Sequence, residues 1–222
     1  MGRQCIPGAD RAIGAAMTAL VFLLLSLPCR AGEALGPRIM EIVERYPTGA
    51  AHPYLWTPGT HTDGTSRDLV FRGVELARND GSPAVHCAGL TFEVWWQALE
   101  AAGPPGWLTP EQVLALKERW YVRDGGEQGM AAALVELGLG VAVTDWRSLL
   151  PGDLMQFWRN SGKGHSAVFV EHRLDRSGAP RSMVYWSAQA SSEGIGRRYV
   201  SVGPSEHQIN AARLYAVRPI QP

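Results

Sequence analysis

The chain has 222 residues, of which 45% are hydrophobic, so it is long enough for one domain with a substantial core. Its 21 basic and 21 acidic residues give a formal net charge of zero. A neutral chain offers no electrostatic basis for binding nucleic acid or an anionic membrane surface, and we expect a small-molecule, peptide or glycan partner instead.

The first 31 residues have the features of a signal peptide. Arg3 and Arg11 supply weak positive charge, residues 12–28 are apolar, and small residues suited to cleavage follow. The apolar run is shorter than a comfortable membrane span, and an uncleaved N-terminal anchor is the alternative. We therefore expect residues 1–31 to be removed, and the mature domain, residues 32–222, to be periplasmic or extracellular without membrane attachment.

Cys87 is expected to be the only cysteine of the mature chain, because Cys5 and Cys29 leave with the signal peptide. A single thiol cannot form an internal disulfide, so it is either a buried core residue or a reactive group. Cys87 follows a Gly-Ser-Pro turn and opens a strongly apolar helical segment. The N–H groups and the dipole of a helix start favour an anion, so this position favours a thiolate nucleophile.

Helical patterns occupy the first half of the mature chain. Each has apolar residues at a spacing of three or four and is bounded by capping residues, glycine or proline. Thr109, Pro110 and Gln112 have the pattern of a capping box at the start of one of them. The expected helices span residues 37–46, 67–78, 87–101, 110–121 and 128–137.

Alternating apolar residues replace the helical spacing after about residue 150. The expected strands span residues 153–158, 165–172, 183–189, 198–202 and 213–218. Helices that precede strands along the chain are typical of the α+β class, in which the strands form an antiparallel sheet. We therefore expect N-terminal helices packed on a five-stranded antiparallel sheet.

A catalytic thiol needs a base, and the setting of His165 favours it among the histidines. His165 follows a flexible Gly-Lys-Gly loop and opens an apolar strand, so it can face a cleft. A purely structural histidine is the alternative. The competing histidines of the mature chain are His52, His61, His86, His172 and His207.

The partner of His165 is predicted from strand register. The segment Asp175-Arg-Ser-Gly is a hairpin signal, and a hairpin centred near Ser177 places residue 165 opposite residue 189. Directly opposed side chains share a face of the sheet, so Gln189 lies beside His165, with Ser187 on the same face. The side-chain carbonyl of Gln189 could accept the ring N–H of His165 and orient the imidazole.

Three motifs along the chain resemble the NlpC-type papain-like cysteine peptidases of bacterial cell walls. The segment Tyr54-Leu-Trp56 resembles the Tyr-x-Trp-Gly motif of that family, and His86-Cys87-Ala-Gly-Leu resembles its Asp-Cys-Ser-Gly-Leu nucleophile motif. The segments 150–157 and 164–170 resemble its Pro-Gly-Asp-Leu…Phe and Gly-His-Val strand pair. The chain differs from the family pattern at His86 and Ala88, and its segments 59–84 and 104–137 are enlarged.

The resemblance implies a single papain-like catalytic domain over residues 32–222. Cys87 would be the nucleophile, His165 the base and Gln189 the third polar residue, and the reaction would hydrolyse amide bonds in peptidoglycan stem peptides. It implies no metal and no cofactor, and a lone cysteine with scattered histidines also lacks the spacing of zinc ligands. The residues expected to contact substrate are Tyr54, Trp56, Trp186 and Ser187.

Two alternatives remain open at this point. The enlarged segments 59–84 and 104–137 are compatible with a papain-like amidase or acyltransferase that acts on a substrate outside the cell wall. The altered residues beside Cys87 are compatible with a catalytically dead binding module, in which the cysteine belongs to the core.

Overall fold

The computed structural model of the chain describes residues 32–56, 62–123 and 126–222. The predicted signal peptide, residues 1–31, lies outside the described residues, and so does the competing candidate His61. Part of the predicted enlarged segment 59–84 also lies outside them.

Four α-helices are present in the described part of the chain, and each matches an expected helix to within three residues at either end. The predicted capping box is confirmed: the Thr109 hydroxyl accepts the Gln112 N–H, and the Gln112 side chain accepts the Thr109 N–H. The helices are α1 (Gly36–Val43), α2 (Cys87–Ala102), α3 (Pro110–Trp120) and α4 (Gly129–Glu136).

The predicted helix over residues 67–78 is wrong, because this segment forms a hairpin of β2 (Leu69–Phe71) and β3 (Val74–Ala77). The turn residues Arg72 and Gly73 both have positive φ angles, 49° and 80°, which a right-handed helix excludes. The hairpin also buries alternate residues, and the ring of Phe71 packs against Trp96 of α2 with centroids 4.9 Å apart. The side chains of this short apolar segment thus alternate with the two-residue period of a strand and not with the spacing of a helix.

The large sheet is antiparallel and confirms the α+β class, but it has seven strands where five were expected. All five expected strands are present. Two short strands, β1 (Glu33–Ala34) and β4 (Gly140–Val143), were missed, and both pair with the last strand. The other five are β5 (Leu154–Arg159), β6 (Gly164–Leu174), β7 (Pro180–Gln189), β8 (Gly194–Ser201) and β9 (Ile209–Gln221).

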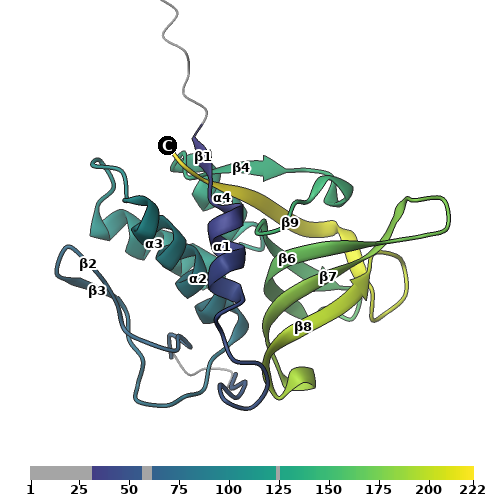
Figure 1. The fold of residues 1–222 in the computed structure, drawn as a ribbon, viewed down its shortest axis with the longest axis horizontal. Helices are drawn as coiled ribbons and strands as arrows, with labels where there is room; N and C mark the ends of the chain where they lie inside the picture. The colour runs from purple at the N-terminus through teal and green to yellow at the C-terminus, as the bar shows by residue number, and fades with distance from the viewer. Residues whose placement is uncertain (1–31, 57–61, 124–125) are drawn as a thin grey trace, which may run out of the picture. The chain divides into compact units, whose positions relative to one another are not determined.

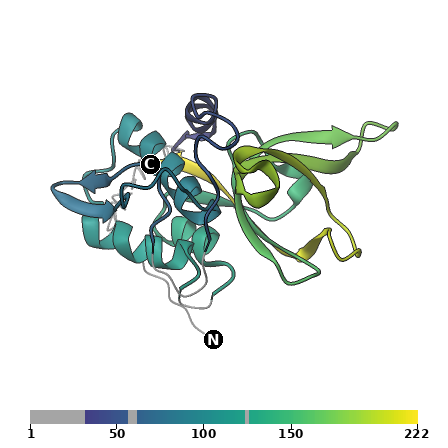
Figure 2. The same ribbon diagram turned by 90° about the horizontal axis from the view of Figure 1, so that it is seen from below.

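Helices α2, α3 and α4 lie to one side of the sheet, as both ribbon views show (Figures 1 and 2). Helix α2 contacts β6, β7 and β9, and α1 contacts both α2 and β9. One apolar cluster joins the helices to residues such as Val168 and Trp186 on the facing side of the sheet. A second cluster, which includes Phe157 and Tyr185, fills the other face of the curled sheet. This packing brings the first residue of α2 close to the first residues of β6.

Candidate active site

The N-terminus of α2 is capped by the side chain of His86. His86 has an extended backbone, and its Nδ1 accepts the N–H of Gly89 at 3.0 Å. Its Nε2 lies 3.2 Å from the carbonyl oxygen of Thr62, so Nε2 carries the proton. Burial lowers the pKa of His86, which keeps the ring neutral. A neutral imidazole thus performs the capping that a carboxylate would perform, and Cys87 follows as the first helical residue.

The loop at residues 62–64 lies across this helix start. A Cβ at Gly89 would come within 2.0 Å of the Asp63 carbonyl oxygen, and a Cβ at Gly64 within 2.1 Å of the His86 ring. Glycine at both positions therefore permits a contact that no other residue allows. The Tyr121 hydroxyl donates to the Asp63 carbonyl oxygen at 2.5 Å and holds the loop from the other side.

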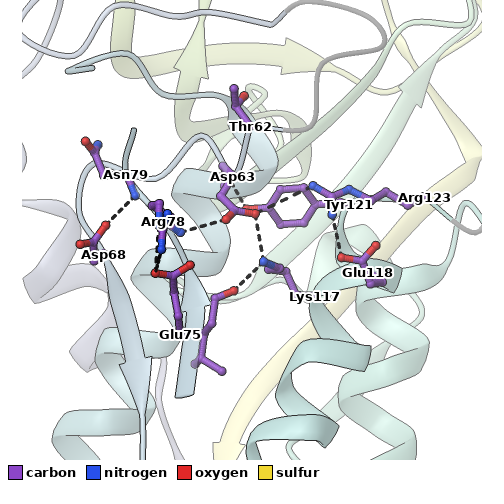
Figure 3. A network of polar contacts seen from close by, with 12 residues as sticks. Thr62, Asp63, Asp68, Glu75, Arg78, Asn79, Lys117, Glu118, Tyr121 and Arg123 are labelled. Atoms are coloured by element: carbon purple, nitrogen blue, oxygen red, sulfur yellow. Dashed lines mark hydrogen bonds and ion pairs between the residues drawn. The ribbon is translucent and has the colours of Figure 1, made fainter. Parts of the chain in front are cut away.

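The side chain of Asp63 ties the same loop to α3 and to the segment after β3 (Figure 3). Its carboxylate accepts hydrogen bonds at 2.9 Å from the Lys117 ammonium of α3 and from the Arg78 backbone N–H after β3. The Lys117 ammonium also donates to the carbonyl oxygen of Leu76. Two residues far from Cys87 in the sequence, Asp63 and Lys117, thereby fix the loop that covers the start of α2.

Cys87 is a free, partly exposed thiol surrounded by backbone N–H groups. Burial raises the pKa of the Cys87 thiol, and hydrogen bonding from the N–H groups of Ser166, Ala88 and Cys87 itself opposes that rise without cancelling it. The N–H groups at the helix start thus lower the pKa of the thiol, as expected, but burial outweighs their effect, and the neutral thiol is favoured in the resting site. The contact with Ser166 places the sulfur beside the residue that follows His165.

His165 lies at the start of β6, one residue after the first, close to the predicted position, and opposite Phe157 of β5. Its ring packs edge-to-face against Phe157 and Tyr185, at centroid distances of 5.7 Å and 5.5 Å. Burial lowers the pKa of His165 to about 3, and the positive charge of Arg159 acts in the same direction. The resting imidazole is therefore neutral, like the thiol.

The predicted strand register is confirmed where β6 and β7 pair. Val168 lies opposite Trp186, and the same register continued by three residues sets His165 against Gln189. Two irregularities nearer the turn shift the register by one residue and shift it back. The register predicted from a hairpin centred near Ser177 therefore holds at Val168, because the two one-residue shifts cancel.

Gln189 is buried beside His165, and a side-chain hydrogen bond with Gln189 opposes the fall in the His165 pKa. The Gln189 carbonyl oxygen accepts the hydroxyl of Tyr185 at 2.7 Å. The Nε2 atoms of His165 and Gln189 are both buried, and neither has a hydrogen-bond partner of normal geometry among the described residues. Gln189 is thus in place beside the imidazole, and its carbonyl oxygen is held by the Tyr185 hydroxyl.

Cys87 and His165 line one cavity of about 550 Å³, although no hydrogen bond of the described residues joins the sulfur to the ring. Tyr54 and Trp56 line it too, as predicted, and burial together with the nearby Cys87 raises the pKa of Tyr54 to about 12. Catalytic hydrogen bonds are often long before substrate binds, so the missing Cys87–His165 hydrogen bond does not exclude a reaction that uses both groups.

Two predicted substrate contacts are not brought to this cavity. Trp186 is 2% exposed and packs against Tyr46 in the core, with ring centroids 5.5 Å apart. Ser187 is fully buried, and its hydroxyl donates to the carbonyl oxygen of Ser166 at 2.6 Å. Both residues support the strands behind the site, because their side chains point into the protein.

Three residues of the site were absent from the predictions. The positive charge of Arg159 lowers the pKa of His165, and the Tyr185 hydroxyl donates a hydrogen bond to Gln189. Gln156 lines the cavity, and its amide donates to the Trp120 carbonyl oxygen and to the Ser166 hydroxyl. The signal for Arg159 was present in the sequence. Residues 160–162 form a tight turn, and the register around it sets strand positions 157 and 159 on the face of residue 165.

Comparison with family models, with curated proteins and with solved structures finds no match to this chain. Within the described ranges, no group of three or more His, Cys, Asp or Glu side chains is arranged to hold a metal ion. None of the helices described by the structure is both long and apolar enough to span a lipid bilayer.

Proposed function

We propose that this chain is a papain-like thiol hydrolase that cleaves amide bonds in peptidoglycan stem peptides. One observation carries the proposal: Cys87 at the start of α2 and His165 at the start of β6 line the same cavity, and Gln189 lies against the histidine. The packing of α2 on a curled antiparallel sheet supports the papain-like assignment, and the predicted signal peptide supports a periplasmic or extracellular location.

The resting charges favour a general-base mechanism over a preformed ion pair. His165 accepts the thiol proton as the Cys87 sulfur attacks the amide carbonyl carbon, and backbone N–H groups at the start of α2 stabilise the oxyanion. His165 then passes the proton to the leaving amine as the C–N bond breaks. Water attacks the thioester, His165 takes its proton, and the acid product leaves as the proton returns to the sulfur.

The test is digestion of purified muropeptides by the wild-type chain and by Cys87→Ala and His165→Ala variants. We expect each substitution to reduce kcat/KM by at least about 1000-fold, because either loss removes the covalent route. Leu174→Ala, at an exposed site on the far end of β6, is the control and should leave the rate unchanged. Cleavage by Cys87→Ala at the wild-type rate would disprove the proposal.

A second candidate is a binding module without catalysis, and the raised pKa of the Cys87 thiol favours it. In that case the cavity would hold a peptide that is never attacked. The same digestion separates the two functions. Muropeptide binding by wild-type protein and by Cys87→Ala with equal affinity, with no product formed by either, would establish the binding module.

A further inference from the structure

A second cavity of about 490 Å³ adjoins the first and is lined by His165 but not by Cys87. The two cavities share Tyr54, Lys163, Gly164 and His165, so they are two parts of one cleft that meet at the histidine. In the proposed reaction the acyl group is bonded to Cys87, and His165 delivers a proton to the leaving amine. The second cavity is therefore open to the leaving amine at the proton donor and lies away from the acyl group on Cys87.

This second cavity carries an excess of positive charge. Arg159 and Lys163 line it, against one acidic residue, Glu206. Neither cation has an ion-pair partner among the residues described by the structure: Arg159 contacts the Tyr185 hydroxyl at 3.4 Å and the Phe157 ring, and Lys163 is exposed. A partly buried guanidinium without a carboxylate is uncommon, because its desolvation is not compensated.

A neutral donor adds to the same cavity. The side-chain nitrogen of Gln189 is buried and has no hydrogen-bond partner in the described chain. Arg159 ends β5, Lys163 lies in the turn before β6, and Gln189 ends β7, and all three offer hydrogen-bond donors to one space. A carboxylate is an acceptor that suits such a set, since a guanidinium binds it through two parallel hydrogen bonds.

We propose that the cavity formed by Arg159, Lys163 and Gln189 binds a carboxylate carried by the leaving amine of the substrate. The inference rests on the proposed hydrolase and narrows its substrates to amides whose released amine is an amino acid or peptide with a free carboxylate close to the scissile bond. A bound carboxylate would also offset the charge of Arg159 beside His165, which favours protonation of the base during the reaction.

The test compares two stem peptides that differ only in the leaving residue, which ends in a free carboxylate or in a carboxamide. We expect wild-type kcat/KM to be about 10- to 100-fold higher for the carboxylate, the difference typical of a hydrogen bond to a charged group. Arg159→Gln and Lys163→Gln should each reduce that ratio and leave carboxamide cleavage less affected. Arg181→Gln removes a positive charge from the opposite end of β7 and should preserve the ratio.

A separate binding measurement distinguishes this inference from the proposed function. The Cys87→Ala chain is titrated with the free leaving amino acid and with its amide. Preferential binding of the carboxylate, weakened by Lys163→Gln, supports the carboxylate site even if no peptide is cleaved. The inference is overturned if wild type cleaves both peptides equally, or if Cys87→Ala binds the amino acid and its amide equally.

Discussion

Tyr185 links the predicted catalytic residues His165 and Gln189 to Arg159, which was not among the predicted site residues. Its hydroxyl donates to the Gln189 carbonyl oxygen at 2.7 Å, accepts from Arg159 at 3.4 Å, and its ring packs against His165. Tyr185 is therefore a positioning residue: it touches the groups that orient the base without reaching the nucleophile. Because all its partners are buried or half-buried, each hydrogen bond is sensitive to the loss of the hydroxyl.

Tyr185→Phe should lower kcat about fivefold and leave KM within about twofold, because a lost hydrogen bond of this kind is worth about 1 kcal/mol. The ring and its contact with His165 remain, so the fold should persist. Steady-state kinetics on a muropeptide substrate provides the measurement. Tyr199→Phe is the matched control, since Tyr199 is 77% exposed on β8. An unchanged kcat for Tyr185→Phe would show that Gln189 needs no such support.

Among the elements, the start of α2 depends on a loop that is held from a distance. The carboxylate of Asp63 and the ammonium of Lys117 are separated by 54 residues in the chain and lie 2.9 Å apart, with side chains 18% and 9% exposed. The loop they fix supplies the carbonyl oxygens that contact His86 and Gly89. The position of Cys87 at the helix start is thus coupled to an ion pair between the loop and α3.

Asp63→Ala should lower the free energy of unfolding by about 3 kcal/mol, because it leaves the buried Lys117 ammonium without its counter-ion. The double variant Asp63→Ala/Lys117→Met should lose less than the single variant, since the orphaned charge is gone. Denaturant unfolding measures both. Glu75→Ala removes an exposed ion pair with Arg78 and should change little. Equal losses for the single and double variants would contradict the coupling.

The molecule as a whole buries two neutral histidines at the site, His86 and His165, and the pKa of each is lowered by burial. In the unfolded chain both titrate near pH 6.5, so the unfolded state takes up protons first as the pH falls. Their stabilising contribution is therefore complete above the unfolded value. It is lost as the pH falls from about 6.5 towards the folded value, which is about 3 for His165.

The free energy of unfolding should consequently fall by about 1–2 kcal/mol between pH 6.5 and pH 5.5, at most about 1.4 kcal/mol per pH unit for each histidine. Carboxylates titrate mostly below this window. Denaturant unfolding at the two pH values measures the change, and His165→Gln should reduce it. His207→Gln, at an exposed position, should not. A stability independent of pH in this range would show that the two histidines bind protons equally in both states.

Local sequence patterns determined most of the secondary structure and the three predicted catalytic residues. Helix periodicity and the Thr109 capping box are properties of neighbouring residues, and they fixed α2 and α3. Strand alternation and one turn signal fixed the register that sets His165 against Gln189. Each of these depends on steric and hydrogen-bonding preferences that act over a few residues.

Tertiary structure alone decided how these elements are used. The segment at residues 69–77 became a hairpin because its alternate side chains enter the core, where Phe71 packs against Trp96 of α2, although its apolar content also suits a helix. Trp186 entered the core instead of the cleft, and His86 became a cap because the loop at residues 62–64 lies against it. Burial reversed the expected pKa shift of Cys87. All of these depend on contacts between distant parts of the chain, and desolvation at such contacts outweighs local preference.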